Sequence, residues 1–168
     1  AGTGLAHAYA SEDLVEVRRI LGRQYHAVVG NPPYIVVKDA ALNAAYRRRY
    51  ASCHRQYSLG APFTERFFDL ALTGNEGRAG FVGLITANSF MKREFGTKLV
   101  EQVLPRVDMT HVVDTAGAYI PGHGTPTVIL LGRHRAPVSD AVRTVMGIKG
   151  EPGTPSDPSR GLVWSAIV

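Results

Sequence analysis

The feature that most constrains this chain is a short apolar segment that runs directly into two consecutive prolines. Residues 26–30 (His-Ala-Val-Val-Gly) are followed by Asn31, Pro32, Pro33 and Tyr34. Such an apolar run is typical of a strand buried on both faces of a parallel sheet. Proline cannot donate a hydrogen bond to a neighbouring strand, so the strand must end there. Because ligands of open α/β sheets bind outside the carboxyl ends of strands, we expect residues 31–34 at a ligand-binding edge.

This tetrapeptide carries the groups that a planar aromatic amine needs in order to react. In the exocyclic amino group of adenine, for example, the nitrogen lone pair is delocalised into the ring, so the nitrogen is a poor nucleophile. The side-chain oxygen of Asn31 and the backbone carbonyl of Pro32 could each accept one of its N–H bonds and aim the lone pair at an electrophile. The prolines fix the direction of that carbonyl before the substrate arrives. Tyr34 offers a flat face on which a base can stack, an interaction of roughly 1–3 kcal/mol.

The motif Asn31-Pro32-Pro33-Tyr34 resembles the catalytic motif of the S-adenosylmethionine-dependent, adenine-specific (N6) DNA methyltransferases. The resemblance extends in the same order over about residues 25–135, through Tyr57-Ser58-Leu59 with the following phenylalanine-rich helix, residues 81–90, and residues 119–130. The residues around the motif, with Lys38-Asp39 and Ser52-Cys53-His54, most closely resemble the sequences of the large methyltransferases of BREX and phage-growth-limitation defence systems.

The resemblance implies a role for each matching residue. Asn31, Pro32, Pro33 and Tyr34 would be catalytic, and the flipped base would bind Tyr34, Tyr119 and Ile120. The implied cofactor is S-adenosylmethionine, with Asn31 as its contact in this chain. The family's glycine-rich cofactor loop lies upstream of the motif, and Ala1-Gly2-Thr3-Gly4 lacks the preceding apolar strand that such a loop needs. Relatives often place an aromatic residue where this chain has Ile120, so either Tyr119 swings in, Ile120 forms an apolar wall, or Tyr119 only fills space.

The charge of the chain suits a polyanionic partner. Its 19 basic and 14 acidic residues give a net charge of +5, which fits phosphate contacts. Candidates for these contacts lie on and beside an expected helix over residues 40–50: Lys38, Arg47, Arg48, Arg49 and Arg55. A solvated helix face explains the same cluster equally well.

Other features exclude several classes of protein. The single cysteine, Cys53, forms no intramolecular disulfide and suits a reducing compartment. No apolar run is long enough to span a membrane, and no Cys/His cluster has metal-ligand spacing. We therefore expect a cytoplasmic protein with no metal site and no membrane contact. Its expected partner is double-stranded DNA, and other defence-system subunits are further possible partners.

The pattern along the chain predicts an α/β fold. Apolar strands are expected at residues 80–87, 109–114 and 127–131, and helices at residues 40–50, 62–72 and 92–104, with a further helix capped by Ser11 and ended by Gly22. Together with the resemblance, this predicts a three-layer Rossmann-like methyltransferase sheet, mostly parallel, with an antiparallel C-terminal hairpin and incomplete at its N-terminus. Residues 1–136 would form a partial methyltransferase catalytic domain. Residues 137–168 would hold an edge strand, a Gly/Pro-rich linker and the truncated start of the next segment.

The predicted function is methylation of the adenine amino group in DNA, of the phage-defence or restriction-modification type. This chain would be the catalytic-motif part of the enzyme, inactive in isolation. Two alternatives stay open. The first is a methyltransferase that acts on RNA or on protein glutamine, since the same tetrapeptide serves such amides and amines. The second is a non-catalytic DNA-binding or assembly fragment.

Overall fold

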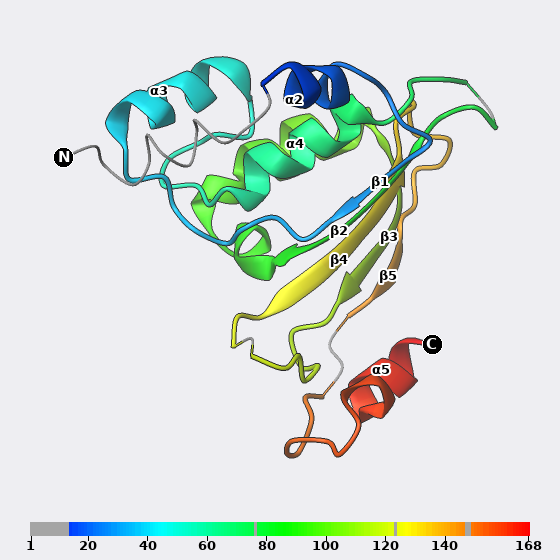
Figure 1. Ribbon diagram of the computed structural model, residues 1–168. Coiled ribbons are helices and arrows are strands. Elements are labelled where there is room, and N and C mark those ends of the chain that lie inside the picture. Colours follow the sequence, from blue (N-terminus) through cyan, green and yellow to red (C-terminus); the bar gives the residue numbers. More distant parts are fainter. Residues whose placement is uncertain (1–13, 76, 123, 147–148) are drawn as a thin grey trace.

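The computed structural model describes residues 14–75, 77–122, 124–146 and 149–168 (Figure 1). The expected cap at Ser11 and the segment 1–4 lie outside these residues. In chain order the elements are α2 (Leu14–Leu21), β1 (Ala27–Gly30), α3 (Ala40–Arg49), α4 (Gly60–Leu70), β2 (Phe81–Ala87), η1 (Asn88–Met91), η2 (Glu94–Gly96), η3 (Leu99–Val103), η4 (Leu104–Arg106), β3 (Asp108–Asp114), β4 (Thr127–Arg133), β5 (Arg143–Val145), η5 (Pro158–Arg160) and α5 (Leu162–Ile167).

The strands form one mixed sheet in the order β1-β2-β4-β3-β5. β1 pairs in parallel with β2, and β3 pairs in parallel with β5, whereas β4 runs antiparallel to both of its neighbours. The predicted antiparallel hairpin of β3 and β4 is confirmed, and β5 lies at the edge of the sheet. The sequence did not predict that β4 lies between β2 and β3, which makes the sheet mixed. Because only β4 is reversed, the carboxyl ends of β1, β2 and β3 meet at one edge.

The helices lie on one face of the sheet. Figure 1 shows α2, α3 and α4 on the same side of the strands. The core between α4, the η3 region and that face is apolar, and its most buried members include Phe68, Val82, Leu84, Leu99, Val128 and Leu130. The opposite face of β1, β2 and β4 is open among the described residues: Val29 is 80% exposed, Phe81 57% and Leu131 37%. The expectation that the first strand is buried on both faces is therefore wrong for the described chain, which has helices on only one side.

The helix expected over residues 92–104 is broken into short pieces. η2 is a 3-10 turn and η3 is a π-helix, closed by a hydrogen bond from the Leu104 N–H to the Leu99 carbonyl. Gly96 packs so closely on the Phe90 backbone that a Cβ would lie 1.8 Å from the Phe90 carbonyl oxygen. Pro105 has no N–H for the next helical hydrogen bond, so the chain tightens into the 3-10 turn η4.

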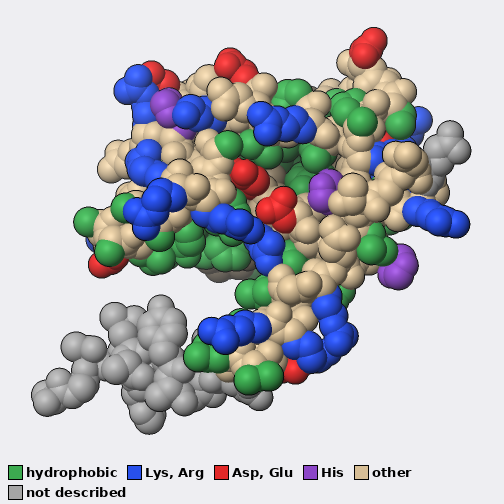
Figure 2. All heavy atoms as spheres, turned by 90° about the horizontal axis from the view of Figure 1, so that it is seen from above, with side chains coloured by type: hydrophobic (Ala, Val, Ile, Leu, Met, Phe, Trp, Pro, Cys, Tyr) green, Lys and Arg blue, Asp and Glu red, His purple; other side chains and the backbone are tan. Residues whose placement is uncertain are grey.

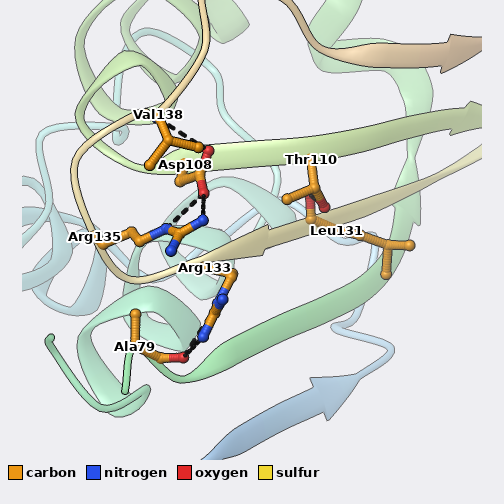
Figure 3. Close-up of polar contacts among 7 residues, drawn as sticks. All are labelled: Ala79, Asp108, Thr110, Leu131, Arg133, Arg135 and Val138. Carbon is orange, nitrogen blue, oxygen red and sulfur yellow. Dashed lines mark hydrogen bonds and ion pairs between the residues drawn. The ribbon is translucent and has the colours of Figure 1, made fainter. Parts of the chain in front are cut away.

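A buried ion pair fixes the end of the sheet opposite residues 31–34 (Figure 3). The Arg135 guanidinium contacts Asp108 Oδ2 at 2.7 Å, with the two side chains only 16% and 6% exposed. The Asp108 backbone N–H also donates to the Arg135 carbonyl at 2.8 Å. Beside this pair, Arg133 stacks 4.4 Å from the Phe81 ring centroid and donates to the Ala79 carbonyl. These contacts hold the start of β3 and the end of β4 to the start of β2.

Candidate active site

Residues 31–34, hereafter the tip, leave the sheet at the carboxyl end of β1. The Asn31 and Pro33 side chains are exposed, Pro32 is buried and Tyr34 is half-buried. Gly30, just before the tip, touches α4: a Cβ there would lie 2.7 Å from Cζ of Phe67, so only glycine lets that ring pack so closely beneath the tip. The tip is thus supported from below by the core while its amide faces outward.

Within the tip, Tyr34 contacts Asn31. The Tyr34 hydroxyl donates to Asn31 Oδ1 at 2.5 Å, and the Ile85 carbonyl lies 3.4 Å from the same hydroxyl. Partial burial raises the pKa of the Tyr34 phenol above its usual value, so the hydroxyl stays protonated at neutral pH. The amide that sequence analysis assigns to the substrate amine is therefore ordered by a side chain of the same motif.

The residues between the tip and α4, hereafter the α3 segment (residues 37–57), leave and rejoin the fold at one place. Val36 pairs with Ser58 in an antiparallel bridge, and the Leu59 N–H donates to the Ile35 carbonyl at 2.8 Å. Asp39 caps the helix of this segment by accepting from the Leu42 N–H at 2.7 Å. The segment is therefore anchored at both ends beside the tip.

Arg47 holds the α3 segment together. Its guanidinium donates to Asn43 Oδ1 at 2.8 Å, to the Cys53 carbonyl at 3.2 Å and to the Arg55 carbonyl. Its Cζ also lies 5.3 Å from the centroid of the Tyr57 ring, within cation–π range. The structure therefore places Arg47, a predicted DNA contact, in a network within the α3 segment, although the residue remains exposed.

The other predicted phosphate contacts are exposed. Lys38, Arg48 and Arg49 all lie at the surface of the α3 segment. Arg55 adopts a positive φ of 49° and pairs with Glu94 at 2.6 Å, with both side chains more than half exposed. Seen from the helical side, Lys and Arg side chains are spread over the surface between apolar patches (Figure 2). On this face, the charged side chains therefore do not outline a single DNA path.

The closing loop between β3 and β4 lies at the same edge of the sheet as the tip. Its base is fixed by a buried hydrogen bond of 2.7 Å between the hydroxyls of Thr115 and Thr127. Tyr119 and Ile120 are both half-buried in this loop. In the strand order, β2 separates β1 from β4, where the loop ends, so at about 4.8 Å per strand the β4 end of the loop lies about 10 Å from the tip, with the end of β2 between them.

Two of the contacts that shape the site could not be inferred from sequence. Glu65 on α4 accepts from the Ser52 N–H at 3.0 Å and from the Ala51 N–H at 3.2 Å, and so fixes the turn after α3. Ile85 contacts the Tyr34 hydroxyl through its backbone carbonyl, and the identity of the Ile85 side chain does not indicate this contact. The spacing of Asn43 and Arg47, four residues apart on one helix face, was a visible signal for the internal role of Arg47.

The described residues contain no cluster of three or more His, Cys, Asp or Glu side chains that could hold a metal ion. Nor does any helix among them have the length and apolar character needed to cross a membrane. The carboxyl edge of the sheet carries polar side chains at the ends of three strands, among them the exposed carboxamide of Asn31.

Comparisons with known proteins agree with the sequence resemblance. The family model for the Eco57I restriction-modification methylase matches residues 7–120. The chain is 55% identical over 167 residues to the adenine-specific methyltransferase PglX of Streptomyces coelicolor, covering 95% of this chain and 14% of PglX. It is 28% identical over 172 residues to the type II methyltransferase M.PaeR7I of Pseudomonas aeruginosa, covering 94% of this chain and 29% of that enzyme. The chain thus spans less than a third of the length of either relative.

Solved structures share the fold at low sequence identity. A Listeria monocytogenes protein assigned to the class I S-adenosylmethionine-dependent methyltransferases superposes with a TM-score of 0.56 at 12% identity, over 86% of this chain and 41% of that protein. The DrdV–DNA complex gives a TM-score of 0.56 at 15% identity, over 79% of this chain and 16% of that chain. The α/β sheet is therefore of the kind found in class I methyltransferases.

Proposed function

Because the chain belongs to the Eco57I restriction-modification methylase family, we propose that it carries the catalytic tip of an enzyme that methylates the exocyclic amino group of adenine in DNA. The observation that carries the proposal is the position of Asn31, whose exposed carboxamide stands at the carboxyl end of β1 in a rigid di-proline tip. The name of the PglX relative and the family description support this choice over methylation of RNA or protein glutamine.

In this reaction the tip acts by positioning and by polarising one nitrogen. A flipped adenine would stack on Tyr34, and its two amino N–H groups would donate hydrogen bonds to Asn31 Oδ1 and to the Pro32 carbonyl. This pair of acceptors draws the nitrogen toward tetrahedral geometry, so that its lone pair points at the methyl donor. The nitrogen would gain the methyl group as the bond from that carbon to the sulfonium sulfur breaks and leaves a neutral thioether, and it would then release one proton to water, so that no dedicated base in this chain is required.

S-adenosylmethionine, when bound, would supply the electrophilic methyl group on its sulfonium. Among the described residues Asn31 is the group we assign to it. We propose that the glycine-rich cofactor loop and a second helical layer belong to other parts of the full-length enzyme, which would complete a three-layer Rossmann-like sheet. The exposed face of β1 and β2 and the much greater length of the relatives support this.

Double-stranded DNA is the proposed partner, and Lys38, Arg48 and Arg49 on the α3 segment are its proposed phosphate contacts. Arg55 stands at the rim of this surface. Its exposed ion pair with Glu94 costs little to break, because such pairs contribute about 0–1 kcal/mol. We assign Arg47 to holding the segment in shape.

The decisive experiment measures N6-methyladenine in DNA after incubation of the full-length protein with S-adenosylmethionine, by mass spectrometry of the nucleosides. Asn31→Ala is expected to lower kcat by about 10²–10³-fold, the typical cost of removing one preorganised polar group that stabilises a transition state. Asn31→Asp keeps an oxygen acceptor and should retain part of the activity.

Asn75→Ala is the matched control, because Asn75 is an exposed asparagine in the turn before β2, at the other end of the sheet. Full activity of Asn31→Ala would overturn the role assigned to Asn31. Methylation of RNA or protein, but not of DNA, would overturn the substrate.

A further inference from the structure

The hydrogen bond between Tyr34 and Asn31 conflicts with the two roles that the proposed function gives these residues. A phenolic O–H prefers the plane of its ring, so a full hydrogen bond to Asn31 Oδ1, which is 2.5 Å from the hydroxyl, draws that oxygen toward the plane of the Tyr34 ring. A base stacked on that ring lies about 3.5 Å above the plane. Its amine would then be farther from Oδ1 than the 2.7–3.2 Å, roughly, of a normal N–H···O bond.

A second acceptor for the hydroxyl is already in place. In the parallel ladder of β1 and β2, the Phe81 N–H donates to the His26 carbonyl, with Ala27 opposite Phe81. Extended by the two-residue repeat of the ladder, this pattern requires the N–H of residue 32 as the donor to the Ile85 carbonyl. Residue 32 is proline and has no N–H. The Ile85 carbonyl therefore gains no ladder bond from position 32, and the Tyr34 hydroxyl lies 3.4 Å from it.

The hydroxyl has one proton to share between these two acceptors. Burial raises the pKa of the phenol, so it remains a donor throughout the neutral range. Donation to Asn31 keeps the carboxamide ordered, whereas donation to Ile85 would turn the hydroxyl toward β2 and away from Asn31.

We propose that in the unliganded protein the Tyr34 hydroxyl occupies the Asn31 oxygen that the base amine uses, and that it transfers its hydrogen bond to the Ile85 carbonyl when the base binds. This inference rests on the proposed function. It makes Tyr34 a competitor of the substrate in the empty site as well as a stacking surface in the occupied one. The missing N–H of Pro32 is what leaves Ile85 able to receive the displaced hydroxyl.

The test is Tyr34→Phe in the full-length protein, which keeps the stacking ring and removes the competitor. We expect the KM for DNA to fall by about threefold to tenfold, the range that one neutral hydrogen bond supplies, with kcat not reduced. The matched control is Tyr25→Phe. Tyr25 also donates to a carbonyl, that of Ile20 at 2.8 Å, but at the amino end of β1. Its loss should leave KM unchanged.

A second readout does not depend on methylation. In unliganded protein labelled with 13C at the asparagine Cγ, Tyr34→Phe should move the Asn31 resonance upfield, because the carboxamide loses a hydrogen bond. Paired labelling of Ile carbonyls and Thr nitrogens selects Ile-Thr pairs such as Ile85-Thr86, and the signal that is missing in an Ile85→Val variant of the full-length protein is that of the Ile85 carbonyl. That resonance should move downfield when DNA binds to the wild type, and not in Tyr34→Phe.

The outcomes separate this inference from the proposed function. A wild-type protein that leaves adenine unmethylated would contradict the function, while the Asn31 resonance would still report on the hydroxyl contact. A lower kcat at unchanged KM in Tyr34→Phe would show that the hydroxyl positions Asn31 for catalysis, and would overturn the inference. An unchanged Asn31 resonance would overturn it as well.

Discussion

Cys53 and Tyr57 form the buried centre of the α3 segment, with exposures of 6% and 1%. Burial raises the pKa of the Cys53 thiol to about 11 and that of the Tyr57 phenol to about 12. Both groups are therefore neutral at physiological pH, and the thiol is a poor nucleophile. Their role is structural, because Tyr57 carries the ring on which Arg47 stacks and Cys53 is buried beside the Tyr57 hydroxyl.

These two groups predict a loss of stability in alkali. Each holds its proton more tightly in the folded state, so its contribution is complete below the ordinary pKa, 9.0 for Cys53 and 10.0 for Tyr57. It is lost as the pH rises toward about 11 and 12. Urea unfolding between pH 7 and 11 should show stability that falls above pH 9. Cys53→Ala should flatten the part of this fall between pH 9 and 11. An identical pH slope in wild type and variant would contradict the assignment.

At the residue scale, the tip could be predicted because its logic is local. Two consecutive prolines end a strand in any context, so an asparagine directly before them lies at the end of that strand. The internal role of Arg47 could not be predicted in the same way. The Cys53 and Arg55 carbonyls reach its guanidinium only because the α3 segment folds back on itself.

At the element scale, α3 separates its arginines by function. All three arginines are exposed, but Arg47 is tied to carbonyls and a ring of the segment, whereas Arg48 and Arg49 in the last turn of α3 make no such contact with the described residues. We expect the double variant Arg48→Ala/Arg49→Ala to weaken DNA binding and to reduce the slope of log K against log salt by up to about 2, since each phosphate contact contributes about 0.9. Thermal stability should be unchanged.

Arg47→Ala should instead lower the melting temperature, with a weaker effect on the salt slope. Arg23→Ala/Arg78→Ala is the matched control, because both arginines are exposed and precede β1 and β2 at the opposite edge of the sheet. Fluorescence anisotropy over a salt series, with melting curves of the same samples, makes the comparison. Equal salt slopes in all three variants and the wild type would contradict the assignment of α3 to the DNA-binding surface.

The elements themselves were predicted unevenly. β2 and β4 are apolar runs between turn residues, and the structure has strands there. Residues 92–104 were predicted as one helix, because their apolar spacing is helical. The close contact of Gly96 with Phe90, which breaks it, comes from tertiary packing. The insertion of β4 beside β2 is a long-range pairing that no local pattern encodes.

At the scale of the whole molecule, the residues that the structure describes cover the sheet on one side only. Val29, Phe81 and Leu131 stand on the open face of β1, β2 and β4. A monomeric protein rarely leaves a contiguous apolar sheet face in water. We therefore expect this face to be covered in the full-length enzyme by the second helical layer proposed above.

Val29→Lys tests this expectation. In the isolated chain the valine is 80% exposed, so the substitution should change the free energy of unfolding by less than about 0.5 kcal/mol and raise solubility. In the full-length enzyme the same lysine would be buried without a partner, and the loss should be several kcal/mol. Urea denaturation of both forms gives the comparison. Equal effects in both would show that the face stays open in the complete enzyme.

The bridge between Val36 and Ser58 has a consequence for how enzymes of this architecture diversify. Because both ends of the intervening stretch are pinned at one point, its exposed parts can change in length and sequence with little strain on the tip, provided that the side chains it buries in the core, such as Cys53 and Tyr57, are kept. Doubling a loop costs only about 0.6 kcal/mol in closure entropy. Grafting the equivalent stretch from another methylase would therefore alter which sequences are approached while the chemistry is inherited intact.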